Sequence, residues 1–123
     1  MPTPEDFLPC NVMAANCPSR QVLQHLTSRW GILILVALLP GTLRFSELKR
    51  TIEGISERML AQNLQFLEAD GMLTRHSMNT VPPHVEYTLT PLGATAAAKM
   101  QELVVLIESE LTQKLRARAN GNT

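Results

Sequence analysis

Residues 55–73 constrain the fold most, because they carry the signals for both ends and for one buried face of a helix. Ser56 can cap the helix N-terminus, since its hydroxyl can accept hydrogen bonds from unpaired backbone N–H groups of the first turn. Gly71 can supply the left-handed turn that ends a helix. Three leucines follow the cap at helical spacing and share one face: Leu60, Leu64 and Leu67. The stretch therefore predicts an amphipathic helix.

The opposite face of this predicted helix is polar. At about 100° per residue, Arg58, Gln62 and Gln65 project away from the leucine seam. Arginine can bind guanine and glutamine can bind adenine with two hydrogen bonds each. This face fits a DNA-recognition helix, and the alternative is a surface helix with an ordinary polar face.

Composition bounds the class of protein. A chain of 123 residues with 45% hydrophobic residues fits one globular domain with a real core. The 11 basic and 11 acidic residues give a formal charge of zero. Phosphate binding depends on lysine and arginine, so this balance counts against nucleic-acid binding unless the basic residues form a local patch.

Targeting signals and cysteine content bear on the compartment. The apolar run at residues 32–39 is too short to span a bilayer, and the acidic, proline-rich N-terminus does not resemble a signal peptide. Two cysteines without a secretory context indicate reduced thiols rather than a structural disulfide. We therefore expect a cytoplasmic protein.

The elements before residue 55 are expected to be helical. Pro18 can begin a helix that runs to about Thr27, with Cys17 as its N-cap. Residues 30–39 are apolar on nearly all sides, which predicts a central core helix that ends at Pro40. Residues 43–45 are a short extended piece, and a third helix opens at Ser46 or one residue earlier and ends near residue 51.

Two strands and a long helix are expected after Gly71. Residues 72–77 and 85–89 are predicted strands, joined by a tip at residues 78–84 that contains two prolines. Thr90 then caps a final helix that runs to about residue 118. The predicted fold is mainly α with a small β-hairpin: a winged helix-turn-helix with N- and C-terminal dimerisation helices.

Six segments carry a family resemblance: residues 17–18, 45–48, 54–60, 67–71, 81–87 and 89–93. Together they resemble the HxlR family of bacterial winged-helix transcriptional regulators, and they are most similar to its YtfH-like members. The resemblance implies a MarR-like fold and a homodimer that binds inverted-repeat operator DNA. His84 and Gln65 stand at positions where the family commonly has a basic residue, which agrees with the neutral charge.

The resemblance and the residue pattern together divide the chain. Residues 1–16 are an N-terminal arm that contributes to dimerisation, and residues 17–90 are the winged helix-turn-helix domain. Residues 91–118 form the C-terminal dimerisation helix, and residues 119–123 are expected to be a disordered tail.

The residues expected to contact DNA lie on the helix-turn-helix and on the wing. Hydroxyl and backbone N–H groups at helix N-termini can hold phosphates, and polar wing residues can enter the minor groove. The alternative roles are helix capping for the serines and a solvated surface for the charged residues. The predicted set is Ser46, Lys49, Arg50, Ser56, Glu57, Arg58, Gln62, Gln65, Arg75, His76, Asn79 and His84.

Cys17 is the candidate redox sensor. Its place at a helix N-terminus, with Arg20 one turn further on, favours the thiolate. In several HxlR-type regulators such a cysteine senses oxidants or electrophiles, which the resemblance implies here. The alternative is a buried, inert cysteine. Cys10 has no comparable environment, and a bond between Cys10 and Cys17 could form within one chain or between two chains.

The final helix carries more apolar surface than a small domain needs, which predicts burial against a second copy. The residues expected at the dimer interface are Val12, Met13, Met100, Leu103, Val104, Ile107 and Leu111.

No other site chemistry is predicted. The three histidines have no ligand spacing with the cysteines, so we expect no metal, and no cofactor or catalytic motif is present. The expected partners are operator DNA, a second copy and an oxidant or small-molecule effector, without a membrane. The alternative function is a winged-helix protein-interaction module without DNA binding.

Overall fold

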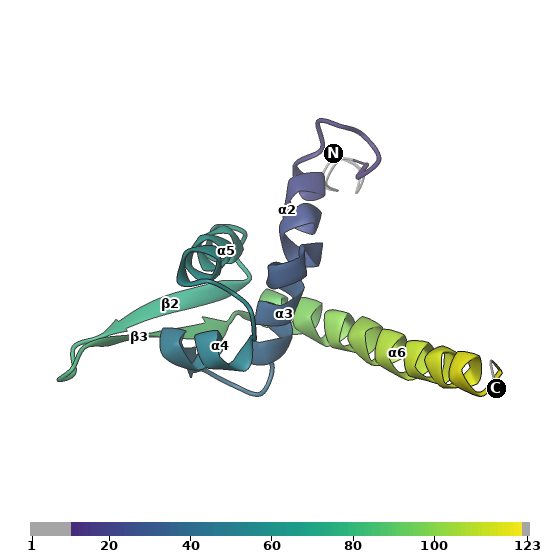
Figure 1. Ribbon diagram of the computed structural model, residues 1–123. Helices are drawn as coiled ribbons and strands as arrows, with labels where there is room; N and C mark the ends of the chain where they lie inside the picture. The colour runs from purple at the N-terminus through teal and green to yellow at the C-terminus, as the bar shows by residue number, and fades with distance from the viewer. Residues whose placement is uncertain (1–10, 122–123) are drawn as a thin grey trace.

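The computed structural model describes residues 11–121 of the chain (Figure 1). In this part of the chain five helices and three strands follow the predicted order, with bounds close to those expected. The elements are α2 (Pro18–Thr27), α3 (Arg29–Leu38), β1 (Leu43–Arg44), α4 (Phe45–Thr51), α5 (Glu57–Ala69), β2 (Leu73–Met78), β3 (His84–Leu89) and α6 (Pro91–Gly121).

The core forms around α3, as its apolar sequence predicts. Ile34 and Leu35 are fully buried, and α3 contacts α2, α4, α5 and α6. The Ser28 hydroxyl caps α3 by accepting a hydrogen bond from the Gly31 N–H at 3.1 Å. Leu64 and Leu67 of α5 belong to the same buried cluster. The helix-turn-helix is therefore fixed to the domain through its leucine seam.

The sheet has one strand more than the predicted hairpin. Its order is β1-β3-β2, and both pairings are antiparallel. Leu43 and Arg44 supply the third strand because they pair with Tyr87 and Glu86 of β3. The extended piece before α4 thus becomes an edge strand two residues long.

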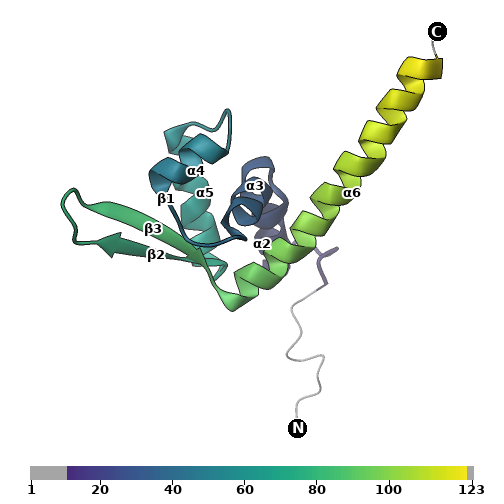
Figure 2. The same ribbon diagram turned by 90° about the horizontal axis from the view of Figure 1, so that it is seen from below.

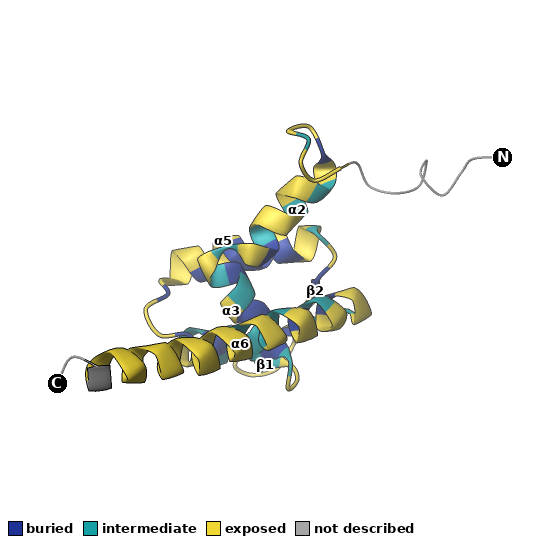
Figure 3. Cartoon of the chain, turned by 90° about the vertical axis from the view of Figure 1, so that its right-hand side faces the viewer, coloured by how far each residue is buried: buried dark blue, intermediate teal, exposed yellow. Residues whose placement is uncertain are grey.

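Helix α6 is 31 residues long and leaves the domain as a single rod (Figure 2). Most of its surface is exposed (Figure 3). The prediction of a disordered tail from residue 119 is wrong up to Gly121, because the helix continues to that residue. Residues 116–119, Arg-Ala-Arg-Ala, are strong helix formers and contain nothing that would stop it. None of the described helices has the length and apolarity needed to cross a membrane.

Helix α2 braces the C-terminal end of α5. His25 of α2 and Asp70, the C-cap of α5, lie 2.7 Å apart between Nδ1 and Oδ2. The His25 ring also stacks on Phe66 of α5, with centroids 4.5 Å apart and planes 2° from parallel. The pair His25 and Asp70 is 45 positions apart in the sequence, and the two contacts fix the orientation of α5 relative to α2.

Candidate nucleic-acid interface

Helices α4 and α5 and the turn between them form the helix-turn-helix. Ile55 of the turn is buried, and Gly54 adopts a positive φ of 89° that favours glycine. The Ser56 hydroxyl caps α5 by accepting from the Met59 N–H at 3.1 Å, as predicted. The chain therefore enters α5 in a fixed direction.

Helix α5 has the two faces that its sequence predicts. Leu60, Leu64 and Leu67 are at most 2% exposed, whereas Arg58 and Gln62 are exposed. The sequence analysis did not single out Asn63, which is 8% exposed. Its Nδ2 donates to the Met59 carbonyl of the preceding turn at 2.8 Å, so the amide is hydrogen-bonded although it is buried.

The other predicted residues of the two helices lie at their accessible ends. Ser46 and Glu57 are exposed in the first turns of α4 and α5. Lys49 is half-buried and Arg50 is exposed in the last turn of α4. The Glu47 carboxylate accepts from the Arg44 N–H at 2.9 Å, so this acidic residue completes the cap of α4.

The wing is the β2–β3 hairpin, which projects away from the helices (Figures 1 and 2). Arg75 and His76 point to opposite faces because successive strand residues alternate. His84 lies on the face of His76 and is tied within the wing: its Nδ1 is 3.1 Å from Thr80 Oγ1 and its Nε2 is 3.4 Å from Glu86 Oε2. Exposed Asn79 lies in the turn.

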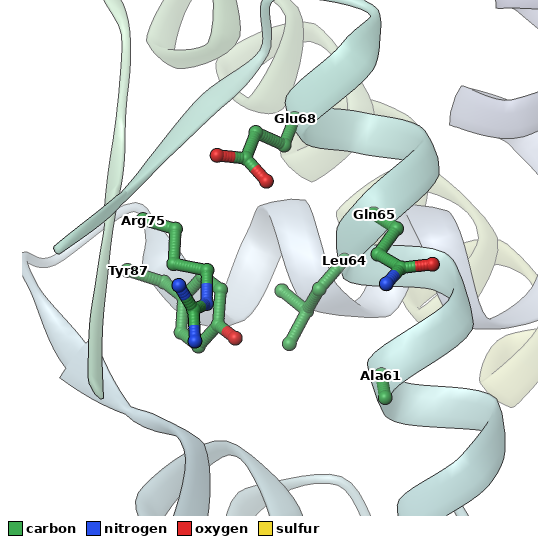
Figure 4. A pocket seen from close by; sticks show the side chains of 6 residues that line it. All are labelled: Ala61, Leu64, Gln65, Glu68, Arg75 and Tyr87. Atoms are coloured by element: carbon green, nitrogen blue, oxygen red, sulfur yellow. The ribbon is translucent and has the colours of Figure 1, made fainter. Parts of the chain in front are cut away.

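Two predicted residues from different elements meet in a slot between α5 and the wing (Figure 4). The slot has a volume of about 360 Å³. Gln65 and Glu68 contribute from α5, and Arg75 contributes from β2. Sequence reasoning missed Tyr87 of β3, which it placed only within the predicted strand 85–89. The remaining lining residues are Ala61 and Leu64.

Helix α6 presents an apolar stripe beyond the domain. Leu103, Ile107 and Leu111 are 44%, 50% and 50% exposed and share one face of the helix. Val104 is half-buried. Met100 packs partly buried against the core of its own domain, so the stripe starts inside the domain and continues outward.

The segment before α2 exposes the two predicted residues Val12 and Met13, at 39% and 82%. Val12 lines an open apolar groove of about 480 Å³ together with Leu23 of α2 and Leu92 of α6. Apolar surface from both ends of the described chain is therefore accessible.

Cys17 is the N-cap of α2, as predicted, and is only 3% exposed. It is disulfide-bonded, so the expectation of a reduced thiol is wrong for this structure. That expectation rested on the reducing environment expected for a cytoplasmic protein. Disulfide formation also depends on whether the fold brings a second thiol within bonding distance of the sulfur. Cys10 lies outside the described residues. Within residues 11–121 no group of three or more His, Cys, Asp or Glu side chains is arranged to hold a metal ion.

Relatives of the chain are transcriptional regulators. The family described as HxlR-like helix-turn-helix matches residues 25–115. The uncharacterised HTH-type transcriptional regulator YtfH of Escherichia coli strain K12 is 57% identical over 108 residues, which cover 88% of this chain and 86% of that protein.

Solved structures agree with this assignment. A transcriptional regulator ytfH from Salmonella typhimurium has a TM-score of 0.81 and 58% identity, over 89% of this chain and 97% of that chain. The redox regulator HypR in its oxidised form has a TM-score of 0.69 and 34% identity, over 76% of this chain and 96% of that chain. One assignment follows from three observations: the helix-turn-helix with its wing, the family match over residues 25–115, and these relatives. The chain belongs to the HxlR-like helix-turn-helix family, a family of transcriptional regulators and not of enzymes.

Proposed function

We propose that the protein is a sequence-specific DNA-binding regulator that acts as a homodimer on inverted-repeat operators in the bacterial cytoplasm. The observation that carries the proposal is the geometry of α5. Its leucine seam is buried, while Arg58 and Gln62 are exposed on the other side. A helix held in this way can enter the major groove and read base edges, with the wing beside it in the minor groove.

The homodimer is supported by the apolar stripe of α6. Burying Leu103, Ile107 and Leu111 against a second copy removes apolar surface that is otherwise in contact with water. A dimer that reads both half-sites needs its two α5 helices about 34 Å apart, one turn of DNA. This spacing suits the two halves of an inverted repeat.

Substituting Arg58 tests the proposal, because this side chain is expected to read a base. Arg58→Ala is expected to lower the affinity for the operator by about 10- to 100-fold, because one bidentate base contact contributes about that much discrimination. Arg58→Lys keeps the charge but not the paired hydrogen bonds, so it is expected to lose specific binding and retain non-specific binding. Mobility shifts and footprints on the promoter of the chain's own gene, at two salt concentrations, measure both.

Arg118→Ala is the matched control, because Arg118 is exposed in the last turn of the 31-residue helix α6, far from the helix-turn-helix. It is expected to bind like the wild type. A wild-type protein that shows no salt-sensitive DNA binding, or an Arg58→Ala variant that binds normally, contradicts the proposal.

Regulation through Cys17 is the second part of the proposal. Cys17 caps α2, and α2 holds the end of α5 through the contact of His25 with Asp70. Oxidation joins the Cys17 sulfur to a second thiol, and two electrons and two protons pass to the oxidant. A change at the start of α2 can therefore reach the recognition helix through a rigid element. The likeness to the redox regulator HypR supports this role.

The expected result is a redox-dependent affinity. DNA binding by the wild type is expected to differ by at least about fivefold between diamide and dithiothreitol, the lower end of usual allosteric coupling. Cys17→Ser is expected to bind equally under both conditions. Non-reducing gels show whether the oxidised bond lies within one chain or between two. A Cys17→Ser variant that keeps the full response assigns Cys17 a structural role only.

One observation favours a second function. The formal charge of zero gives little general attraction to phosphates, and a winged helix with a polar outer face can instead bind a protein. Salt-insensitive binding of a protein partner, abolished by Arg58→Ala in the absence of DNA binding, is the result that supports this function.

A further inference from the structure

The slot between α5 and the wing contains a tyrosine whose ring is buried and whose hydroxyl opens into the slot. Tyr87 is 7% exposed and belongs to the core cluster with Leu64. Its hydroxyl reaches the slot (Figure 4) and makes no hydrogen bond to any residue in the described part of the chain. No buried side-chain nitrogen or oxygen of the described residues lacks a partner, so this hydroxyl is accessible to solvent and to a ligand in the slot. The slot therefore offers a donor at the end of a rigid, packed ring.

Arg75 lies beside this hydroxyl because of the strand register. It pairs directly with Tyr87 across β2 and β3, and residues opposite each other in a sheet project from the same face. Its one side-chain hydrogen bond within the described residues runs from Nη1 to Ser77 Oγ at 3.5 Å, a long contact. The guanidinium therefore lines the same slot as Tyr87 and has only this long contact within the described residues, which leaves it largely available for a ligand.

The helix side of the slot adds one more donor and limits the space. Gln65 lines the slot from α5, on the far side of Leu64 from Tyr87 in the view of Figure 4. Ala61 is small, so the helix wall is open one turn nearer the start of α5. Glu68 lines the other end without an ion pair to Arg75. Its carboxylate repels an anion, so a phosphate in the slot would lie away from Glu68.

We propose that this slot binds one phosphate of the DNA backbone, held by the Tyr87 hydroxyl, the Arg75 guanidinium and the Gln65 amide. The inference rests on the proposed function, in which α5 enters the major groove and the wing enters the minor groove. The sugar-phosphate backbone separates the two grooves, so it must pass between these elements. Neutral and charged donors that line one slot suit the oxygens of a phosphate. Gln65 and Arg75 then position the protein and do not read bases.

Tyr87→Phe tests the site with the smallest change, because the buried ring stays in place. We expect a loss of about tenfold in affinity, the usual effect of a hydrogen bond to a charged group. The loss should be equal for operator and for a non-specific duplex of the same length, since a phosphate carries no sequence information. The slope of log affinity against log salt should stay the same, because a hydroxyl displaces no counterion.

Arg75→Gln is the companion variant, because Arg75 is exposed and its replacement spares the core. It should weaken both duplexes and reduce the salt slope by about one ion. Thermal melting of both variants should match that of the wild type. If Tyr87→Phe does not fold, Arg75→Gln tests the inference by itself. The inference then requires that its salt slope falls by the same amount on both duplexes.

The other outcomes overturn the inference in distinguishable ways. A wild type that binds DNA with an unaffected Tyr87→Phe variant refutes the slot and leaves the proposed function standing. A loss confined to the operator assigns the hydroxyl to base reading. Saturable binding of inorganic phosphate at constant ionic strength, abolished in Tyr87→Phe, makes the slot a free-anion site. A wild type that binds no DNA refutes both proposals.

Discussion

Replacing Ile107 and Leu111 together by glutamine is expected to convert the dimer into monomers and to lower operator affinity by more than about 100-fold. Both side chains are 50% exposed on the part of α6 that leaves the domain. Each therefore has about half of its surface left to bury against a partner. Few other surface substitutions should lower dimerisation and operator affinity so strongly while leaving the fold of the domain unchanged.

The size of the effect follows from symmetry. Burying the remaining half of one such side chain contributes about 1 kcal/mol, and a two-fold interface contains four of them, which gives about 4 kcal/mol. Polar amides placed in the same interface lose hydrogen bonds to water, which adds to the loss. A change of this size moves a dimer that is stable at micromolar concentration into the millimolar range.

The effect on DNA binding is indirect. A dimer places two α5 helices on one DNA molecule, so the second half-site is bound at a high effective concentration. A monomer loses this advantage but keeps its contacts to one half-site. We therefore expect weak binding to an isolated half-site to be unchanged, which separates loss of dimerisation from damage to α5.

Sedimentation velocity over a range of concentrations measures the association. Glutamine leaves the net charge unaltered and has a helix propensity close to that of leucine. Ser109→Gln is the control, because Ser109 is exposed on the side of α6 opposite to Ile107 and Leu111. A double variant that remains dimeric at low micromolar concentration, with normal operator affinity, contradicts the placement of the interface.

The sequence was sufficient to predict the helices because their signals are local. Ser56, the leucine spacing and Gly71 lie within one stretch, and each acts on its own helix. The two faces of α5 follow from that spacing alone. The same holds for the start of α2 at Pro18.

The candidate site was predicted only in part because it depends on contacts between distant residues. Arg75 and Tyr87 become neighbours through strand register, which the pattern of either strand does not specify. His25 meets Asp70 across 45 positions. Met100 continues the apolar stripe of α6 but packs partly on its own domain. The sequence could not show this, because helical periodicity does not reveal which molecule covers a face.

Gly93→Ala is expected to lower the free energy of unfolding by about 3 kcal/mol, near the upper end for overpacking a buried site. Gly93 is buried in the first turn of α6, and a Cβ added there would overlap the Met72 carbonyl oxygen. Alanine is a better helix former than glycine by up to about 1 kcal/mol, so the overlap must outweigh a favourable term.

Neither side of this contact can move freely. The Met72 carbonyl accepts from the Thr90 N–H at 3.0 Å. The Thr90 hydroxyl accepts from the Gly93 N–H at 3.0 Å and donates to the Gly71 carbonyl at 2.6 Å. Relieving the overlap therefore breaks hydrogen bonds that join the start of α6 to the segment between α5 and β2. The glycine is needed for this close approach of two backbones.

Gly71→Ala is the comparison that isolates this cause. A Cβ at Gly71 meets no atom within 4 Å, and the substitution is disfavoured only by the positive φ of 79°. It should lower the free energy of unfolding by about 1 kcal/mol. Denaturant unfolding of both variants at one protein concentration measures the difference, since the stability of a dimer depends on concentration. A Gly93→Ala variant as stable as Gly71→Ala would show that α6 can shift away from Met72 at little energetic cost, and that the junction is not rigid.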